Sequence, residues 1–340
     1  MNTSFRFECV TNFFKSDGIE FSVVRDPEEP RVKDMQIYKE ITGDMDKHKF
    51  YSLPKYVQIN EDYLKQILNG QSEMSQYNPL DEAPNLYTEL AKIKYFDIDS
   101  LSKFVKNYSI PLGEKLFSKD DYKVLTYKMD LFKFYQELYD FKKALNIYTA
   151  LQSNDEIKIA QYSEEYIHYI EKEAKPIFKE AFLKQIELSH NEIMQRAKES
   201  GLDKTDVFLD YLQNNVDIDI SSGIIDKWHK IKDESPEIKT KNYLTDLINN
   251  WERGKTIYAV VANQIRPGVS FKNLFEVAYY QLCQAITGNT ELRECKNCGN
   301  LFEVDDDRRN FCPPLPGRKI SSCQNTFNQR MKRKRKKHQS

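Results

Sequence analysis

The sequence predicts a mainly α-helical protein with a small α+β region at its N-terminus and a four-cysteine zinc module at its C-terminus. Three observations lead to this prediction. Apolar residues recur at intervals of three and four through much of residues 116–288, which is the period of a helix face. Two short β-prone runs lie near the start of the chain, and four of the six cysteines fall between Cys295 and Cys323. At ~100 to 200 residues per domain, 340 residues suggest two or three domains.

The first domain is expected to cover residues 1–115. Asn60 and Asp97 stand where a side-chain oxygen caps a helix, and Pro111 with Gly113 marks the boundary. The expected elements are β-prone runs at 5–10 and 20–24 and helices at 61–69, 85–93 and 98–108.

A helical domain is expected over residues 116–288. Ser118 with Asp121 forms an approximate capping box for a long helix, whose Phe and Tyr residues at helical spacing indicate core packing. A second helical stretch follows from about 157 to 198, interrupted at Pro176, because proline removes a backbone donor.

The end of this domain carries one strand and one further helix. Residues 257–261 are β-prone and are expected to form a single buried strand. The last helix should be capped by Ser270 and should end at Gly288.

The third domain, residues 289–340, is defined by its cysteines. The sequence has little glycine and no glycine-rich phosphate loop, so the clustered thiols are its clearest chemical signal. Reduced thiols at a two-residue spacing suit one tetrahedral Zn²⁺, with a redox or free-thiol cluster as the alternative. The predicted ligands of the single structural zinc are Cys295, Cys298, Cys312 and Cys323. Ser321-Ser322 is expected to cap a helix that carries Cys323 in its first turn, and Asp305–Asp307 are expected to form an exposed turn.

Charge is distributed unevenly along the chain. The 51 basic and 52 acidic residues give a net charge of -1. Residues 293–340 contain 13 basic and 5 acidic residues, or +8, so residues 1–292 carry 38 minus 47, or -9. Basic side chains that neutralise phosphates release counterions, which favours nucleic-acid binding, while a solubilising tail or a localisation signal is the alternative. The predicted phosphate contacts are Arg318, Lys319, Arg330, Lys332, Arg333, Lys334, Arg335, Lys336 and Lys337.

The cysteine region resembles a known family of fingers. The segment 293–302, then Arg308-Arg309-Asn310-Phe311-Cys312, and then Ser322-Cys323 with the basic end are similar to the CGNR-type treble-clef zinc fingers at the C-termini of bacterial and phage proteins. The resemblance implies a treble-clef-like module in a protein that binds DNA or acts as a transcriptional regulator. We therefore expect DNA as the nucleic-acid partner in preference to RNA. The chain departs from the name-giving signature, because Gln-Asn-Thr follows Cys323.

Other functions rank lower. An HNH-type nuclease needs histidine inside the finger, and none lies between Cys295 and Cys323. His168 is interpreted as a packed or surface residue. We therefore expect a cytoplasmic regulator or effector without catalysis and without a membrane partner. The alternative is a stress or phage-defence effector whose acidic helical body binds a protein, with the zinc module serving only the fold.

Overall fold

A computed structural model describes residues 8–9, 12–15, 21–24, 32–69, 75–118, 123–172, 194–195, 198–199, 230–231, 233–250, 255–261, 264–314 and 320–337. By its internal contacts the chain divides into two compact units, one of Met1–Gln152 with Asp246–Ser340 and the other of Ser153–Thr245. This division differs from the expected boundaries at 115 and 288, because the N-terminal sheet, the long helix that follows it and the cysteines all belong to the first unit.

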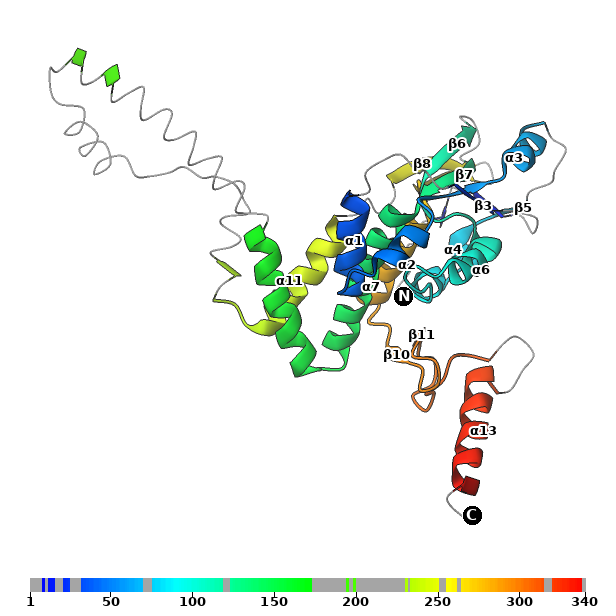
Figure 1. Ribbon diagram of the computed structural model, residues 1–340, viewed down its shortest axis with the longest axis vertical. Coiled ribbons are helices and arrows are strands. Elements are labelled where there is room, and N and C mark those ends of the chain that lie inside the picture. The colour runs from blue at the N-terminus through cyan, green and yellow to red at the C-terminus, as the bar shows by residue number, and fades with distance from the viewer. Residues whose placement is uncertain are drawn as a thin grey trace. The chain divides into compact units, whose positions relative to one another are not determined.

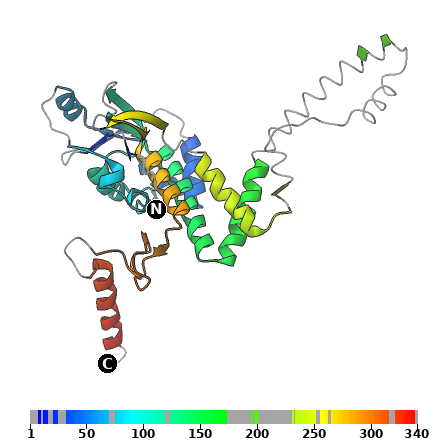
Figure 2. The same cartoon turned by 180° about the vertical axis from the view of Figure 1, so that it is seen from behind.

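The expected mainly helical class with an α+β N-terminal region is confirmed (Figure 1, Figure 2). The helices are α1 (Val32–Thr42), α2 (Lys47–Ser52), α3 (Glu61–Leu68), α4 (Pro79–Glu82), α5 (Leu86–Ala91), α6 (Ile98–Tyr108), α7 (Leu131–Gln152), α11 (Pro236–Asn249), α12 (Leu274–Thr287) and α13 (Ser322–Lys337). Residues 156–172 are also helical. The caps predicted for α3 and α6 are confirmed, because Asn60 Oδ1 accepts from the Asp62 backbone at 2.9 Å and Asp97 Oδ1 accepts from that of Asp99 at 3.1 Å.

The strands among the described residues form three sheets. The strands are β1 (Glu8–Cys9), β2 (Asn12–Lys15), β3 (Phe21–Val24), β4 (Tyr56–Ile59), β5 (Ser75–Tyr77), β6 (Glu114–Ser118), β7 (Lys123–Asp130), β8 (Lys255–Val261), β9 (Gln264–Ser270), β10 (Leu292–Glu294) and β11 (Leu301–Glu303). The largest sheet has the order β3-β4-β7-β2-β5, with β6 also paired to β7. The others are β1-β9-β8 and the β10-β11 hairpin beside the first two cysteines.

The predicted start of the long helix is wrong. Ser118 ends β6 and lies opposite Lys123 of β7 in an antiparallel pair, so both residues belong to strands where the helix was expected to begin. The helix α7 begins at Leu131 instead. Asp130 Oδ1 caps it by accepting from the backbone N–H groups of Phe132 and Lys133 at 3.0 and 2.9 Å.

The predicted cap of the last helix before the cysteines is also wrong. Ser270 is the final residue of β9, which pairs with β8, so the expected single strand is one half of a hairpin. Asn273 caps α12, because its Oδ1 accepts from the Glu276 backbone at 2.9 Å. The predicted end at Gly288 is confirmed.

The core of the first unit centres on α7 and α12, which lie side by side in both views (Figure 1, Figure 2). The rings of Phe134 and Phe275 are 5.8 Å apart, and those of Phe141 and Tyr279 are 4.9 Å apart at 84°. Edge-to-face pairs of this kind contribute about 0.5–1.5 kcal/mol each beyond the area they bury. The aromatic residues of these helices therefore form the core, as predicted.

The second unit packs tyrosine rings between two helical segments. The buried rings of Tyr166 and Tyr243 are stacked, with centroids 5.2 Å apart. Thr240 Oγ1 donates to the Ile159 carbonyl at 2.9 Å and supports the same contact. The predicted break at Pro176 lies outside the described residues.

Candidate metal centre

The first two cysteines lie on a tight turn between β10 and β11. Within this turn, the Cys295 N–H donates to the Asn300 carbonyl at 2.9 Å, and the Gly299 N–H donates to the Cys295 carbonyl at 2.8 Å. Gly299 has φ +74°, a left-handed conformation that glycine adopts without a side-chain penalty. The Cys-x2-Cys spacing therefore folds into a knuckle that presents both sulfurs to one side.

The other two cysteines are brought to the knuckle by separate contacts. The Lys296 N–H donates to the Asn310 carbonyl at 3.0 Å, which places the segment before Cys312 beside the turn. Cys323 lies in the first turn of α13, where Ser321 Oγ accepts from the Gln324 backbone at 3.0 Å as the predicted helix cap. Phe311 packs against Phe327 of α13 at 5.2 Å between centroids and fixes the start of that helix.

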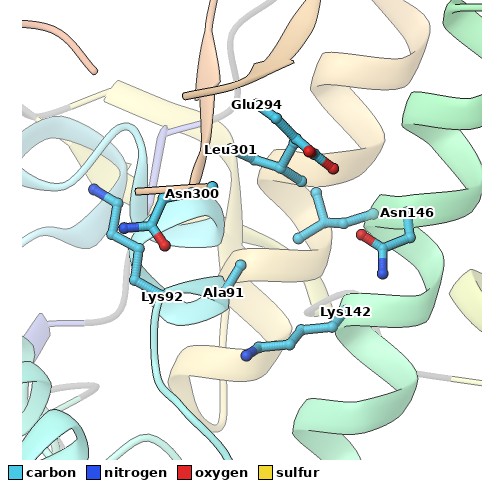
Figure 3. Close-up of a pocket in the computed structure, with 9 residues that line it drawn as sticks. Ala91, Lys92, Lys142, Asn146, Glu294, Asn300 and Leu301 are labelled. Atoms are coloured by element: carbon cyan, nitrogen blue, oxygen red, sulfur yellow. The ribbon is translucent and has the colours of Figure 1, made fainter. Parts of the chain in front are cut away.

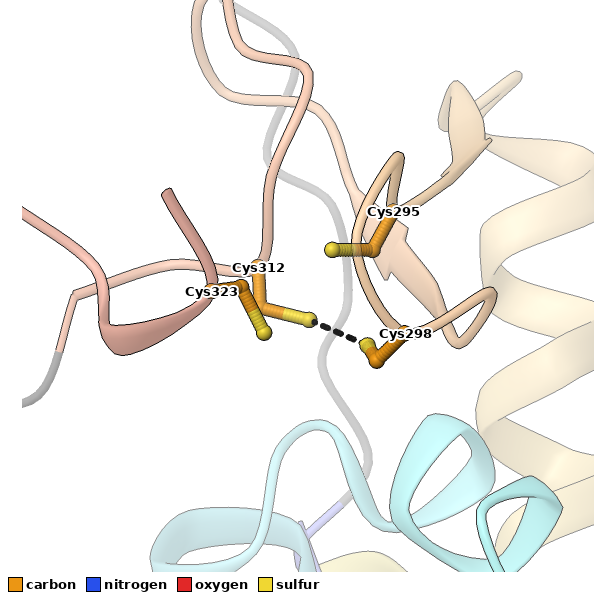
Figure 4. Close-up of side chains that lie close together, drawn as sticks. All are labelled: Cys295, Cys298, Cys312 and Cys323. Atoms are coloured by element: carbon orange, nitrogen blue, oxygen red, sulfur yellow. Dashed lines mark hydrogen bonds between the residues drawn. The ribbon is translucent and has the colours of Figure 1, made fainter. Parts of the chain in front are cut away.

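The four sulfurs surround one point (Figure 4). All lie within 4.8 Å of one another, and the Cys298 and Cys312 sulfurs are 3.5 Å apart. Tetrahedral ligands at a metal–sulfur distance of about 2.3 Å would be about 3.8 Å apart, whereas a disulfide requires about 2.05 Å. The distances therefore fit four thiolates around one metal ion and exclude a disulfide between Cys298 and Cys312.

The environment of the sulfurs differs from one to the next. Burial opposes ionisation of Cys295, but backbone N–H groups of Cys298, Asn297 and Cys312 outweigh it and lower the pKa to about 6. Burial and the neighbouring thiols raise the pKa of Cys312 and of Cys323. Four thiolates without a cation would repel each other, so the cluster needs a positive ion to be fully ionised.

The predicted phosphate contacts lie mainly on α13. Five of these basic residues have described side chains, and none of the five forms an ion pair with a carboxylate of the described residues. These exposed residues are Arg330, Lys332, Arg333, Lys334 and Arg335. Lys336 and Lys337 lie in the last turn of the helix. Arg318 and Lys319 lie outside the described residues.

Arg330 also joins α13 to the knuckle. Its guanidinium donates to Asn297 Oδ1 at 2.6 Å, and the Asn297 side chain also hydrogen-bonds Cys323. The basic helix is thus tied to the cluster by its cysteine, by the Phe327 ring and by this bond.

Neither a metal nor a phosphate contact was predicted for Arg293, Arg308 and Arg309. Arg293 donates to the carbonyls of Asp307 and Arg309 at 2.8 and 2.7 Å, and Arg309 pairs with Asp305 at 2.5 Å. These bonds close the exposed turn predicted at Asp305–Asp307. Arg308 differs, because its side chain is 91% exposed and, among the described residues, pairs with Asp306 alone. It borders a groove of about 290 Å³ beside Cys312, which we call the module groove.

The C-terminal module is hydrogen-bonded to the helices of its own unit. Tyr87 of α5 donates to Glu303 Oε1 at 2.6 Å, and Tyr148 of α7 donates to the Thr290 carbonyl at 2.9 Å. The Leu292 N–H donates to Gln152 Oε1 at 3.0 Å. These contacts seat the knuckle on α5 and α7.

A smaller cleft of about 110 Å³ lies at this joint, between α5, α7 and the knuckle (Figure 3). Lys142 Nζ donates to the Ile93 carbonyl at 2.5 Å and lies 4.4 Å from the Tyr95 ring centroid, and burial lowers its pKa to about 8. Lys92 pairs with Glu89. Both lysines therefore have partners within the helical body.

The described residues hold no second cluster of metal-ligating side chains. His168 is 82% exposed and lies 3.8 Å from Glu171, as expected of a surface residue. Across the same described part, no helix is long and apolar enough to cross a membrane. Comparison of the chain with family models, curated proteins and solved structures found no match.

Proposed function

We propose that this chain is a zinc-containing nucleic-acid-binding protein, a regulator or effector without catalysis whose preferred partner is DNA. One observation carries the proposal: the fourth cysteine of the cluster and the basic segment Arg330–Lys337 belong to the same helix, α13. A metal ion held by Cys323 would therefore fix the direction in which this positive helix leaves the protein.

Zinc is the metal that we propose for the cluster. Four thiolates in a tetrahedral arrangement suit Zn²⁺ or iron–sulfur chemistry, and the single point enclosed here suits one ion. Bound zinc would supply structure only, by joining the knuckle, the segment before α13 and α13 itself. The resemblance to treble-clef zinc fingers supports the same assignment.

The charge density of the basic segment matches that of DNA. Seven of the eight residues from Arg330 to Lys337 are basic, and α13 contains no acid. At 1.5 Å rise per residue this segment is about 10.5 Å long, or one positive charge per ~1.5 Å. Duplex DNA carries one negative charge per ~1.7 Å of its axis. Charge neutralisation along this helix is thus possible without bending either molecule.

The test is a binding measurement on the full chain with its metal content determined. Labelled duplex DNA and the matching RNA would be titrated against the intact protein and against a chain ending at Gln329. We expect at least ~10-fold weaker binding after truncation, and tighter binding of DNA than of RNA by the intact chain. A control in which the exposed body lysines Lys33, Lys39 and Lys47 become Gln should bind like the intact chain. Equal affinity of the intact and truncated chains would refute the proposal.

A second function is favoured by the seating of the module on α5 and α7. The bonds from Tyr87, Tyr148 and Gln152 suit a module that completes the fold of the body. In that function the acidic body binds a protein partner and α13 contacts no nucleic acid. Recovery of a protein partner that survives nuclease treatment and truncation at Gln329 would favour it.

A further inference from the structure

The module groove lies beside the metal cluster, and its walls come from the loop before Cys312 and from the start of α13. The side chains that matter for its chemistry are Asp306, Arg308, Asn310, Phe311 and Gln324. Its volume of about 290 Å³ is close to the lower end of the ~300–1,000 Å³ of ligand pockets. The groove is thus large enough for one planar heterocycle.

The arginines of the module divide into two kinds. Arg293 and Arg309 are 28% and 27% exposed, and they hold the Asp305–Asp307 turn through carbonyl and carboxylate contacts. Arg308 is 91% exposed, and its contact with Asp306 at 3.3 Å lies in solvent. Because an exposed ion pair contributes little, Arg308 can exchange this partner for a ligand at small cost.

The groove offers both donors and acceptors. Gln324 and Asn310 each carry an amide with an acceptor oxygen and a donor nitrogen, and Asp306 adds acceptors. A phosphate site would need donors alone, because phosphate oxygens are acceptors. The edge of a nucleobase presents both kinds of group, and Asn and Gln recognise such edges through paired hydrogen bonds.

An aromatic ring lies against the same space. Phe311 is half-buried and packs on Phe327 at 53° and 5.2 Å, while part of its surface lines the groove. Stacking of a base on an aromatic side chain is worth about 5- to 150-fold in affinity. A stacked base inside a duplex cannot reach such a ring, whereas an unpaired base can.

We propose that the module groove binds one unpaired nucleobase, stacked on Phe311 and read by Arg308, Asn310 and Gln324. This proposal rests on the proposed function, because α13 holds the phosphates next to the base. The continuity is structural: Gln324 stands in the first turn of the helix whose last two turns carry the basic segment. The substrate class is therefore nucleic acid with a single-stranded segment, an overhang or a loop.

The test compares single-stranded oligonucleotides of about 12 nucleotides with abasic oligonucleotides of the same length, which keep the phosphates and lack the bases. Gln324→Ala and Asn310→Ala are the groove variants. Asn328→Ala and Gln329→Ala are the controls, since both are exposed amides of α13 outside the groove. We expect the intact chain and the controls to prefer the base-containing oligonucleotide by at least ~10-fold, and each groove variant to show a smaller preference, because it loses an amide contact to the base while stacking on Phe311 remains.

Each result is decisive. A smaller preference in the groove variants, with the salt dependence unchanged, supports the proposal. Salt-dependent binding that is equal for abasic and base-containing strands overturns the groove proposal and leaves the proposed function in place. A preference that is undiminished in both groove variants places the base elsewhere and also overturns it. Failure of every strand and every duplex to bind overturns both proposals.

Discussion

The salt dependence of binding is the sharpest prediction for α13. Helix geometry places Arg330, Arg333, Lys334 and Lys337 on one side at 100° per residue, and Lys332, Arg335 and Lys336 on the other. If one side follows a single phosphate backbone, about four contacts form. If α13 enters a groove between two backbones, both sides are used and about seven contacts form.

These two geometries give different slopes. A plot of log affinity against log salt falls by about 0.9 per neutralised phosphate, so four contacts give about -3.6 and seven give about -6.3. Between 50 and 200 mM salt, the affinity would then fall by about 150-fold or by about 6,000-fold. A slope measured by fluorescence anisotropy with duplex DNA separates them.

Paired neutral substitutions identify the side that binds. Arg333→Gln with Lys334→Gln should reduce the slope by about 1.8 if their side contacts phosphates, and Lys332→Gln with Arg335→Gln tests the opposite side in the same way. A reduction by only one pair indicates a single backbone, and a reduction by both indicates a groove. A slope shallower than about -1 in the intact chain, or no change with either pair, would contradict the assignment of α13 as the contact.

Three further predictions follow from the body and the cluster. Cys312→Ser should lower the metal content below one ion per chain by mass spectrometry of the native protein, while Cys283→Ser on α12 should leave it unchanged. Burial and Asp140 raise the pKa of Glu137 from 4.5 to about 7, so the folded state binds the extra proton and stability falls as pH rises from about 4.5 through 7. This loss of folding stability is at most about 3 kcal/mol, and Glu137→Gln should remove it. By calorimetry we expect the variant to have a higher Tm than the intact chain at pH 8 and nearly the same Tm at pH 4. Tyr87→Phe deletes the 2.6 Å bond to Glu303 and should destabilise the chain by about 1–2 kcal/mol with the metal content unchanged; an unchanged denaturation midpoint would show that this bond does not hold the module.

Local signals in the sequence predicted the features that depend on neighbouring residues. The caps Asn60, Asp97 and Ser321 each bond to a backbone group within three residues, so residue type and spacing are enough to identify them. The knuckle is local for the same reason, since its turn closes between Cys295 and Asn300. The clustering of the four sulfurs was predictable because one metal ion binds several thiolates, so closely spaced cysteines are expected to converge.

Features that depend on distant partners were not predictable in this way. Ser118 and Asp121 match a helix cap in isolation, but Ser118 pairs with Lys123 of β7. β7 in turn pairs with β2, which lies about 110 residues earlier, and the helix begins only after β7, at Leu131. Ser270 was misassigned for a similar reason, because its backbone pairs with β8. The module groove arises where the loop before Cys312 meets α13, so its lining residues come together only in three dimensions.

Removal of the proposed zinc ion would distinguish a structural role of the metal from an electrostatic one. Four thiolates with one Zn²⁺ carry a charge of -2. Once the ion is gone, the raised pKa values of Cys312 and Cys323 favour their protonation while Cys295, with a pKa of about 6, stays ionised at neutral pH, so the centre becomes less negative. Charge alone therefore predicts equal or tighter binding of DNA after chelation. Apart from Arg330, whose guanidinium bonds Asn297 of the knuckle, the basic segment begins at Lys332, nine residues or about 13 Å along the helix from Cys323, which exceeds the ~8 Å screening length at physiological salt. Electrostatic coupling between the centre and the segment is accordingly weak, and the metal would act by attaching α13 to the knuckle.

We expect chelation to weaken binding of duplex DNA by at least ~10-fold, and we expect added zinc to restore it. The helical circular dichroism of the chain should change little on chelation, because the α7–α12 core contains none of the four cysteines. Binding that tightens on chelation would show that the charge of the centre, and not its geometry, controls α13.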